Sequence, residues 1–186
     1  TLRDNSNYLM PREAEMRTKA QKAADTFRAN GASSDDIVYC MLMDEPPGAP
    51  LNHLVGQKEP TEKFRVWLQE QGKGLAELLP GIEGDLSWEQ VRPVNDTERD
   101  KYPALHYFTQ KFRTYALGNF MELQSGILQE AYGAKIPMVA NFSDGAVYYA
   151  NFYGQGVDYF ELMETTGQNA ICSEDWANGA STYQFG

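Results

Sequence analysis

Residues 37–45 read IVYCMLMDE, and two prolines follow at once. Seven largely apolar residues lead into two carboxylates, Asp44 and Glu45. A short apolar run of this kind is typical of a parallel strand that is buried on both faces and brings polar side chains to its carboxyl end. In barrels of parallel strands, that end carries the catalytic residues. The stretch therefore predicts a buried strand over 37–43 with a candidate acid, Glu45, at its rim.

Helical and strand patterns alternate along the rest of the chain. Helical spacing of apolar residues predicts helices over 8–30, 61–72, 102–132 and 156–166, and short apolar runs predict strands over 136–142 and 169–172. Pro11 suits the first turn of the first helix. The side chains expected to be buried on the last helix are those of Val157, Phe160, Leu162 and Met163. Residues 73–101 show no clear periodicity beyond one turn of helix near Leu75.

Strands that alternate with helices are expected to run parallel, so their carboxyl ends share one edge of the sheet. Polar residues follow all three predicted strands. The set at this shared edge is Asp44 and Glu45, then Asn141, then Glu174, Asp175 and Trp176. The sequence thus predicts an α/β fold with one polar rim.

Three strands do not close a barrel, and an eight-stranded (β/α)8 barrel takes about 250 residues. The chain of 186 residues is therefore either a small open α/β sheet or a segment of a longer enzyme. We favour the segment, with residues 1–186 as a single piece of a TIM-barrel catalytic domain that is incomplete without further chain.

Composition narrows the classes of partner. The formal net charge is −10, which disfavours binding to nucleic acid and to anionic membrane surfaces. No apolar run approaches the roughly 20 residues that a membrane-spanning helix needs. The sequence predicts a soluble protein and leaves its compartment open. Aromatic residues make up 12% of the chain, which suits both sugar rings and ordinary core packing.

The only two cysteines, Cys40 and Cys172, lie in apolar runs and are expected to be buried, reduced thiols. Neither His53 nor His106 is spaced to form a zinc site with them. No metal or other cofactor is predicted.

The carboxylates at the rim fit one type of chemistry. Glycoside hydrolysis uses two carboxyl groups across the scissile bond, and the proton donor needs a raised pKa, which partial burial supplies. Glu45 suits the donor, and Asp44 could orient it or bind a sugar hydroxyl. An acidic pair before a proline-rich loop is also a common way to end a strand, so spacing alone leaves both interpretations open.

Further short motifs follow Asp44-Glu45 in a fixed order. They are FRVWLQEQG over 64–72, Trp88-Glu89-Gln90-Val91, Phe112-Arg113 and Gln124, PMVANF over 137–142, Asp158-Tyr159-Phe160, and Asp175-Trp176. In this order, and over about residues 37–176, the chain resembles the glycoside hydrolase family 42 β-galactosidases and the wider clan of (β/α)8-barrel glycosidases.

The resemblance implies that the three strands are the fourth to sixth of the barrel, and that the chain runs from about helix 3 to strand 6. It also implies a retaining mechanism on a β-linked sugar, with Glu45 as general acid/base and the nucleophile beyond Gly186. The substrate-binding positions would be Asp44, Asn141, Glu174, Asp175 and Trp176. The implied partners are a carbohydrate, the remainder of the barrel and, in a homo-oligomer, further copies of the chain.

One departure keeps alternatives open. The family has Asn where this chain has Asp44, and an ionised carboxylate cannot donate a hydrogen bond to a sugar hydroxyl. A second hypothesis is therefore a barrel that binds carbohydrate or serves a structural role without catalysis. A third is an unrelated small α/β binding domain, complete at 186 residues. Within the fold, Trp67 is expected to pack in the core and Arg113 to pair with other protein groups.

Overall fold

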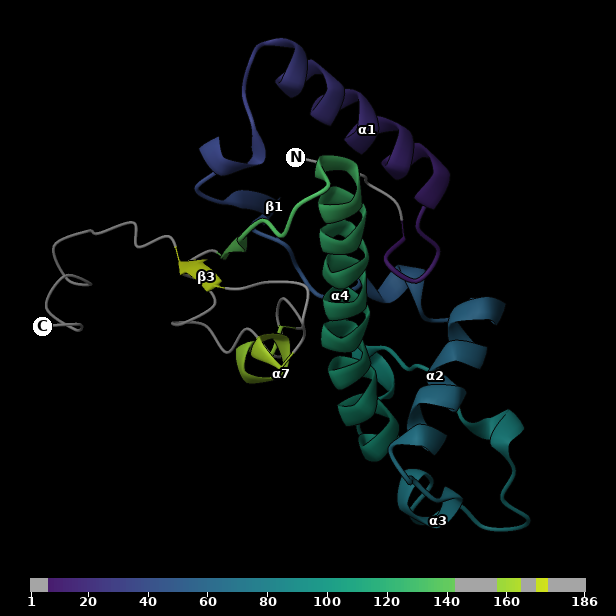
Figure 1. The fold of residues 1–186 in the computed structure, drawn as a ribbon. Coiled ribbons are helices and arrows are strands. Elements are labelled where there is room, and N and C mark those ends of the chain that lie inside the picture. Colours follow the sequence, from purple (N-terminus) through teal and green to yellow (C-terminus); the bar gives the residue numbers. More distant parts are fainter. Residues whose placement is uncertain (1–6, 143–156, 165–169, 174–186) are drawn as a thin grey trace, which may run out of the picture.

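A computed structural model describes residues 7–142, 157–164 and 170–173, which form a set of helices and a small parallel sheet beside one long helix (Figure 1). The helices are α1 (Glu13–Ala29), α2 (Lys58–Glu70), α3 (Leu75–Leu78), α4 (Pro103–Tyr132) and α7 (Tyr159–Met163). The strands are β1 (Cys40–Asp44), β2 (Met138–Phe142) and β3 (Ala170–Ser173). Short 3-10 helices lie at Ser34–Asp36, Leu51–His53, Trp88–Gln90 and Asp96–Glu98.

The three strands are parallel and lie in the order β1-β2-β3. This confirms the predicted parallel sheet. The chain returns from β1 to β2 through α2, α3 and α4, and from β2 to β3 through α7. Because the strands run parallel, the carboxyl ends of β1 and β2 lie at one edge of the sheet.

Strands β1 and β2 both begin later than predicted, at Cys40 and Met138. Where the two strands begin, the backbone N–H of Cys40 donates to the carbonyl of Pro137 at 2.8 Å. Pro137 has no N–H to donate, so pairing does not extend further towards the start of β2. The expectation that Val38 and Tyr39 are buried is accordingly wrong, because their side chains are exposed.

Helix α4 runs through the middle of the molecule and touches both halves of it (Figure 1). Pro103 occupies its first turn, where a missing N–H costs nothing. Gly133 ends it with a φ of 68°, a left-handed conformation that favours glycine, and its N–H bonds the carbonyls of Gln129 and Glu130. The predicted 102–132 helix is confirmed almost to the residue.

Two hydrophobic clusters share this helix. One cluster packs the C-terminal half of α4, from Leu117 onward, against α1, β1 and β2. The other packs its N-terminal half, up to Ala116, against α2, α3 and the segment that contains Val91 and Val94. Trp67 lies in the second cluster against Phe112, which confirms its predicted packing role.

The starts of the first two helices differ from prediction. Helix α1 begins at Glu13, so Pro11 precedes it rather than forming its first turn. Helix α2 begins at Lys58 and holds Pro60 as its third residue. The first four N–H groups of a helix have no partner within it, which is why a proline is tolerated there.

Helix α7 buries fewer residues than expected. Leu162 and the preceding Val157 are buried, but Phe160 is 88% exposed and Met163 is 51% exposed. Residues two apart on a helix point in nearly opposite directions, so Phe160 and Leu162 cannot share a buried face. In the part of the chain that the structure describes, no helix combines the length and apolarity required to cross a membrane.

Helix α1 packs on α4 through small residues. Ala20 and Ala24 have no exposed surface, whereas the neighbouring Ala23 faces solvent. Arg28 also donates to the carbonyl of Ala131 on α4 at 2.6 Å. The absence of larger side chains at Ala20 and Ala24 permits the two helices to approach closely.

Replacing Ala24 by Leu should therefore overpack the contact between α1 and α4 and lower the free energy of unfolding by about 1–3 kcal/mol. Ala23→Leu adds the same side chain one position away on the exposed face and should change stability by less than about 0.5 kcal/mol. Urea unfolding of the two variants measures the difference. Equal effects would contradict the assigned packing of α1.

Candidate active site at the carboxyl ends of the strands

Strand β1 carries a bulge just before its acidic end. Met41 pairs with Val139, but Asp44 pairs with Asn141, so two residues of β1 lie opposite the single residue Ala140. A bulge bends its strand and redirects the side chains that follow, and such bulges are frequent next to active sites. The carboxyl end of β1 is thus turned relative to a regular strand.

Glu45, the residue after β1, has a left-handed backbone with φ of 45°. It is the one non-glycine residue with positive φ in the part of the chain that the structure describes. Its N–H donates to the carbonyl of Asn141 at 2.7 Å, and its side chain is exposed. A left-handed glutamate costs about 1–3 kcal/mol and persists only where the surrounding structure fixes it.

Asp44 and Asn141 are joined by their side chains. The Nδ2 of Asn141 donates to the Oδ1 of Asp44 at 2.9 Å. Asn141 is 5% exposed while Asp44 is exposed, so the amide holds the carboxylate at the surface of the rim. The structure therefore places Asp44, Glu45 and Asn141 at the same edge of the sheet, and their roles in a site stay predictions.

Three further predicted site residues, Glu174, Asp175 and Trp176, lie outside the described residues. Strand β3 directly precedes them and pairs with β2, Phe142 opposite Ser173. Their placement at the rim stays a prediction.

The loop after Glu45 is anchored to helix α4. The N–H of Ala49 donates to the carbonyl of Arg113 at 3.1 Å, and the Nε of Arg113 donates back to the carbonyl of Ala49 at 2.9 Å. Both residues are buried. Arg113 thus pairs within the fold, as predicted, and its partner is the segment that follows the candidate acid.

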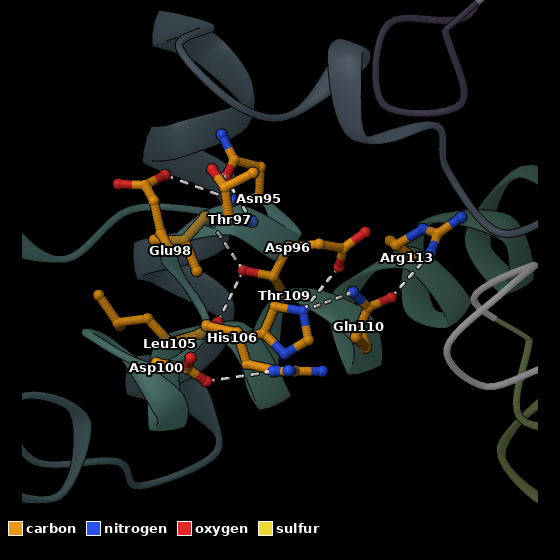
Figure 2. A network of polar contacts seen from close by, with 12 residues as sticks. Asn95, Asp96, Thr97, Glu98, Asp100, Leu105, His106, Thr109, Gln110 and Arg113 are labelled. Carbon is orange, nitrogen blue, oxygen red and sulfur yellow. Dashed lines mark hydrogen bonds and ion pairs between the residues drawn. The ribbon is translucent and has the colours of Figure 1, made fainter.

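A chain of polar contacts continues from Arg113 along α4 (Figure 2). The Nη1 of Arg113 donates to the Oε1 of Gln110 at 2.7 Å, and Gln110 Nε2 lies 3.3 Å from His106 Nε2. The same histidine nitrogen lies 2.8 Å from the Oδ1 of Asp96. One nitrogen cannot donate to Asp96 and accept from Gln110 at once, and the shorter distance favours donation to Asp96.

The segment before α4 is tied to the same face of the helix. Thr109 Oγ1 accepts from the N–H of Val94 at 3.0 Å and donates to the carbonyl of Leu105 at 2.7 Å. Asn95 caps the 3-10 helix Asp96–Glu98, and Glu98 completes a reciprocal capping box. The aperiodic stretch 73–101 concealed this anchoring, although the Asn-x-x-Glu pattern at Asn95 is the recognisable signal of a cap.

Burial and nearby charge shift the pKa of Arg113 and of Cys40. Burial lowers the pKa of the Arg113 guanidinium, and the negative charge of Asp96 partly opposes that shift. Burial also raises the pKa of the Cys40 thiol, a free cysteine that is only half-buried rather than buried as expected. Within residues 7–142, 157–164 and 170–173, no group of three or more His, Cys, Asp or Glu side chains could hold a metal ion.

Comparisons with known proteins bear on the fold. No protein-family model and no curated protein matches the chain. Among solved structures, the β-galactosidase from Rahnella sp. R3 matches 88% of this chain with a TM-score of 0.63 and 14% identity. The β-galactosidase from Bacillus circulans sp. alkalophilus matches 97% of it with a TM-score of 0.66 and 14% identity.

This chain spans only 22% and 26% of the lengths of those two β-galactosidases. At such low identity the likeness concerns the fold alone. The chain therefore has the α/β fold of a part of these enzymes.

The contact between Asp44 and Asn141 predicts an energetic coupling. In a double-mutant cycle of Asp44→Ala and Asn141→Ala, the two changes should couple by about 1 kcal/mol in unfolding free energy, because each removes the same hydrogen bond. Asp35→Ala removes an exposed carboxylate from the 3-10 helix Ser34–Asp36, and its effect should be additive with that of Asn141→Ala. Denaturant unfolding measures both cycles. If the effects of Asp44→Ala and Asn141→Ala are also additive, the contact is refuted.

The ion pair of Glu98 with Arg92 predicts a pH dependence. The hydrogen bond from Arg92 lowers the pKa of Glu98 below its ordinary value of 4.5. The pair therefore stabilises the fold above that pH, and its contribution is lost as the pH falls through the lowered pKa. Glu98→Gln should be less stable than the wild type at pH 7, with a difference that shrinks below about pH 4.5.

Thermal unfolding at several pH values measures this effect. In an Arg92→Met background, Glu98→Gln should lose most of its pH-dependent effect. If Glu98→Gln changes stability with the same pH dependence in the Arg92→Met background, the effect comes from a group other than Arg92.

Proposed function

We propose that this chain is part of the catalytic domain of a retaining glycoside hydrolase that acts on a β-linked sugar, in the manner of family 42 β-galactosidases. In this proposal the chain supplies about helix 3 to strand 6 of a (β/α)8 barrel, and further polypeptide supplies the rest. The observation that supports it most is Glu45, a left-handed glutamate at the carboxyl end of a parallel strand, in a fold shared with parts of two β-galactosidases.

Glu45 would act as general acid and then as general base. As an acid it protonates the glycosidic oxygen while a second carboxylate attacks the sugar from the opposite face. As a base it then takes a proton from the water that releases the sugar. The second carboxylate is expected outside this chain, about 5–5.5 Å from Glu45 as in retaining enzymes. Glu45 is exposed among the described residues, and we expect the remainder of the barrel to enclose it.

The neighbouring residues would bind substrate. Asp44 carries a carboxylate held by Asn141, so it can accept a hydrogen bond from a sugar hydroxyl but cannot donate one while ionised. We assign Glu174, Asp175 and Trp176 to the same rim, with Trp176 as a face on which a sugar ring stacks. The partners in this proposal are the carbohydrate, the remainder of the barrel and further copies of the chain in a homo-oligomer.

Asp44 also favours a second candidate function. Two adjacent carboxylates replace the Asn-Glu pair of the family, and this departs from its catalytic pattern. A barrel that binds carbohydrate without cleaving it would tolerate that change. The two functions differ in whether Glu45 is needed for turnover.

Substitution of Glu45 by Gln in the complete protein tests the proposal. A phenyl glycoside has a poor leaving group that needs a proton, so kcat/KM should fall by about 10²–10⁴-fold. Dinitrophenolate leaves without protonation, so kcat/KM on a dinitrophenyl glycoside should fall by less than about tenfold. Glu83→Gln changes an exposed carboxylate in a loop and serves as the matched control. It should leave kcat/KM on both substrates unchanged.

Undiminished turnover of the phenyl glycoside by Glu45→Gln would remove Glu45 from the acid role. Absence of turnover by the wild-type protein on every aryl β-glycoside, together with retained binding of the sugar, would favour the non-catalytic alternative.

A further inference from the structure

Arg113 binds the loop after Glu45 through both its side chain and its backbone. It is only 7% exposed, and it exchanges two hydrogen bonds with Ala49, one from its Nε and one to its backbone carbonyl. Burying a guanidinium costs desolvation energy, which its hydrogen bonds must offset. A buried apolar residue would avoid that cost but would leave the buried carbonyl of Ala49 without this donor, so the guanidinium ties the loop to α4 in a fixed direction.

The loop between Glu45 and Ala49 is short and stiff. It consists of Pro46, Pro47 and Gly48, and the two prolines have fixed φ angles. Pro46 and Gly48 are buried together with Ala49. Because the two prolines restrict rotation and the segment is packed, we expect a displacement of Ala49 to reach Glu45 in large part.

The backbone of Glu45 is held at both ends. Its own N–H is bound to the carbonyl of Asn141, and Ala49 is bound to Arg113. A left-handed glutamate relaxes to an ordinary conformation unless such contacts fix it on both sides. Loss of the Arg113 contacts would free the second of these two anchors.

Arg113 is itself braced along α4. Its Nη1 donates to Gln110, which contacts His106, and His106 bonds Asp96 (Figure 2). The next residue, Thr114, accepts a hydrogen bond at 3.0 Å from the N–H of Asp158, which caps the start of α7. One turn of α4 thus anchors the segment that follows β1 and the segment that starts α7.

We propose that Arg113 is a positioning residue that sets the direction of the Glu45 carboxyl through the segment Pro46–Ala49. It does not touch substrate. The inference rests on the proposed function, since it needs Glu45 to transfer a proton. Misplacement of a proton donor by about 1 Å can lower a rate by about 100-fold, so a positioning residue has a measurable kinetic effect.

Arg113→Met in the complete protein, compared with Arg113→Lys, tests this role. Met fills similar space without donors, and Lys retains one donor in place of the guanidinium fork. For Arg113→Met, kcat/KM on the phenyl glycoside should fall by about 10- to 100-fold, with a fall of less than about threefold on the dinitrophenyl glycoside. Arg113→Lys should lie between Arg113→Met and the wild type. Arg99→Met removes an exposed arginine and should leave kcat/KM on both glycosides unchanged.

A purely structural role predicts a different pattern, because fewer folded molecules lower turnover of both substrates by the same factor. Equal losses for Arg113→Met would therefore overturn the inference, as would an unchanged phenyl glycoside rate. Where Arg113→Met fails to fold, Gln110→Met takes its place, because it removes the brace but keeps the contacts to Ala49. The same preferential loss on the phenyl glycoside supports the inference, and equal loss refutes it.

The two proposals fail separately. If Glu45→Gln shows no dependence on the leaving group, the proposed function is wrong. If Glu45→Gln shows that dependence but Arg113→Met does not (or Gln110→Met, where Arg113→Met fails to fold), only the positioning role is wrong.

Discussion

The structure depends on helix α4 being buried along both of its halves. Its C-terminal half packs under the sheet and α1, and its N-terminal half packs against α2 and the loops before it. A helix covered on so many sides places polar groups out of solvent, and these must find partners. His106, Thr109, Gln110 and Arg113 meet that demand with each other and with loop backbone, so the same constraint that satisfies them also fixes the loops.

The rim of the sheet follows from the loops that α4 holds. The bulge in β1 turns the strand end, the N–H of Glu45 is bound by β2, and Ala49 is bound by α4. None of these contacts is strong alone, since a hydrogen bond contributes about 1 kcal/mol net. Together they are comparable to the strain of a left-handed residue, about 1–3 kcal/mol, and so can hold Glu45 in its conformation.

Local patterns predicted the elements well and the rim only in part. Periodicity and the Gly133 stop located α4, and the apolar runs located three parallel strands with Asp44, Glu45 and Asn141 at one edge. The late start of β1 depends on Pro137, nearly 100 residues away in sequence, so no local window contains it. The contact of Arg113 with Ala49 likewise joins residues 64 apart. The bulge and the left-handed Glu45 arise from pairing geometry, which composition does not encode.

Residue 45 is a glutamate at a backbone position that favours glycine. The fold is shared with parts of two β-galactosidases at 14% identity, so the likeness in fold does not by itself explain which residue stands at position 45. A position with φ of 45° would be filled at least energy by glycine, which adopts that conformation without strain. Six positions with positive φ in the described part of the chain do hold glycine. The seventh is a glutamate at the edge where two parallel strands end, and the proposed role of Glu45 as a proton donor gives a reason for a carboxyl group at so strained a position.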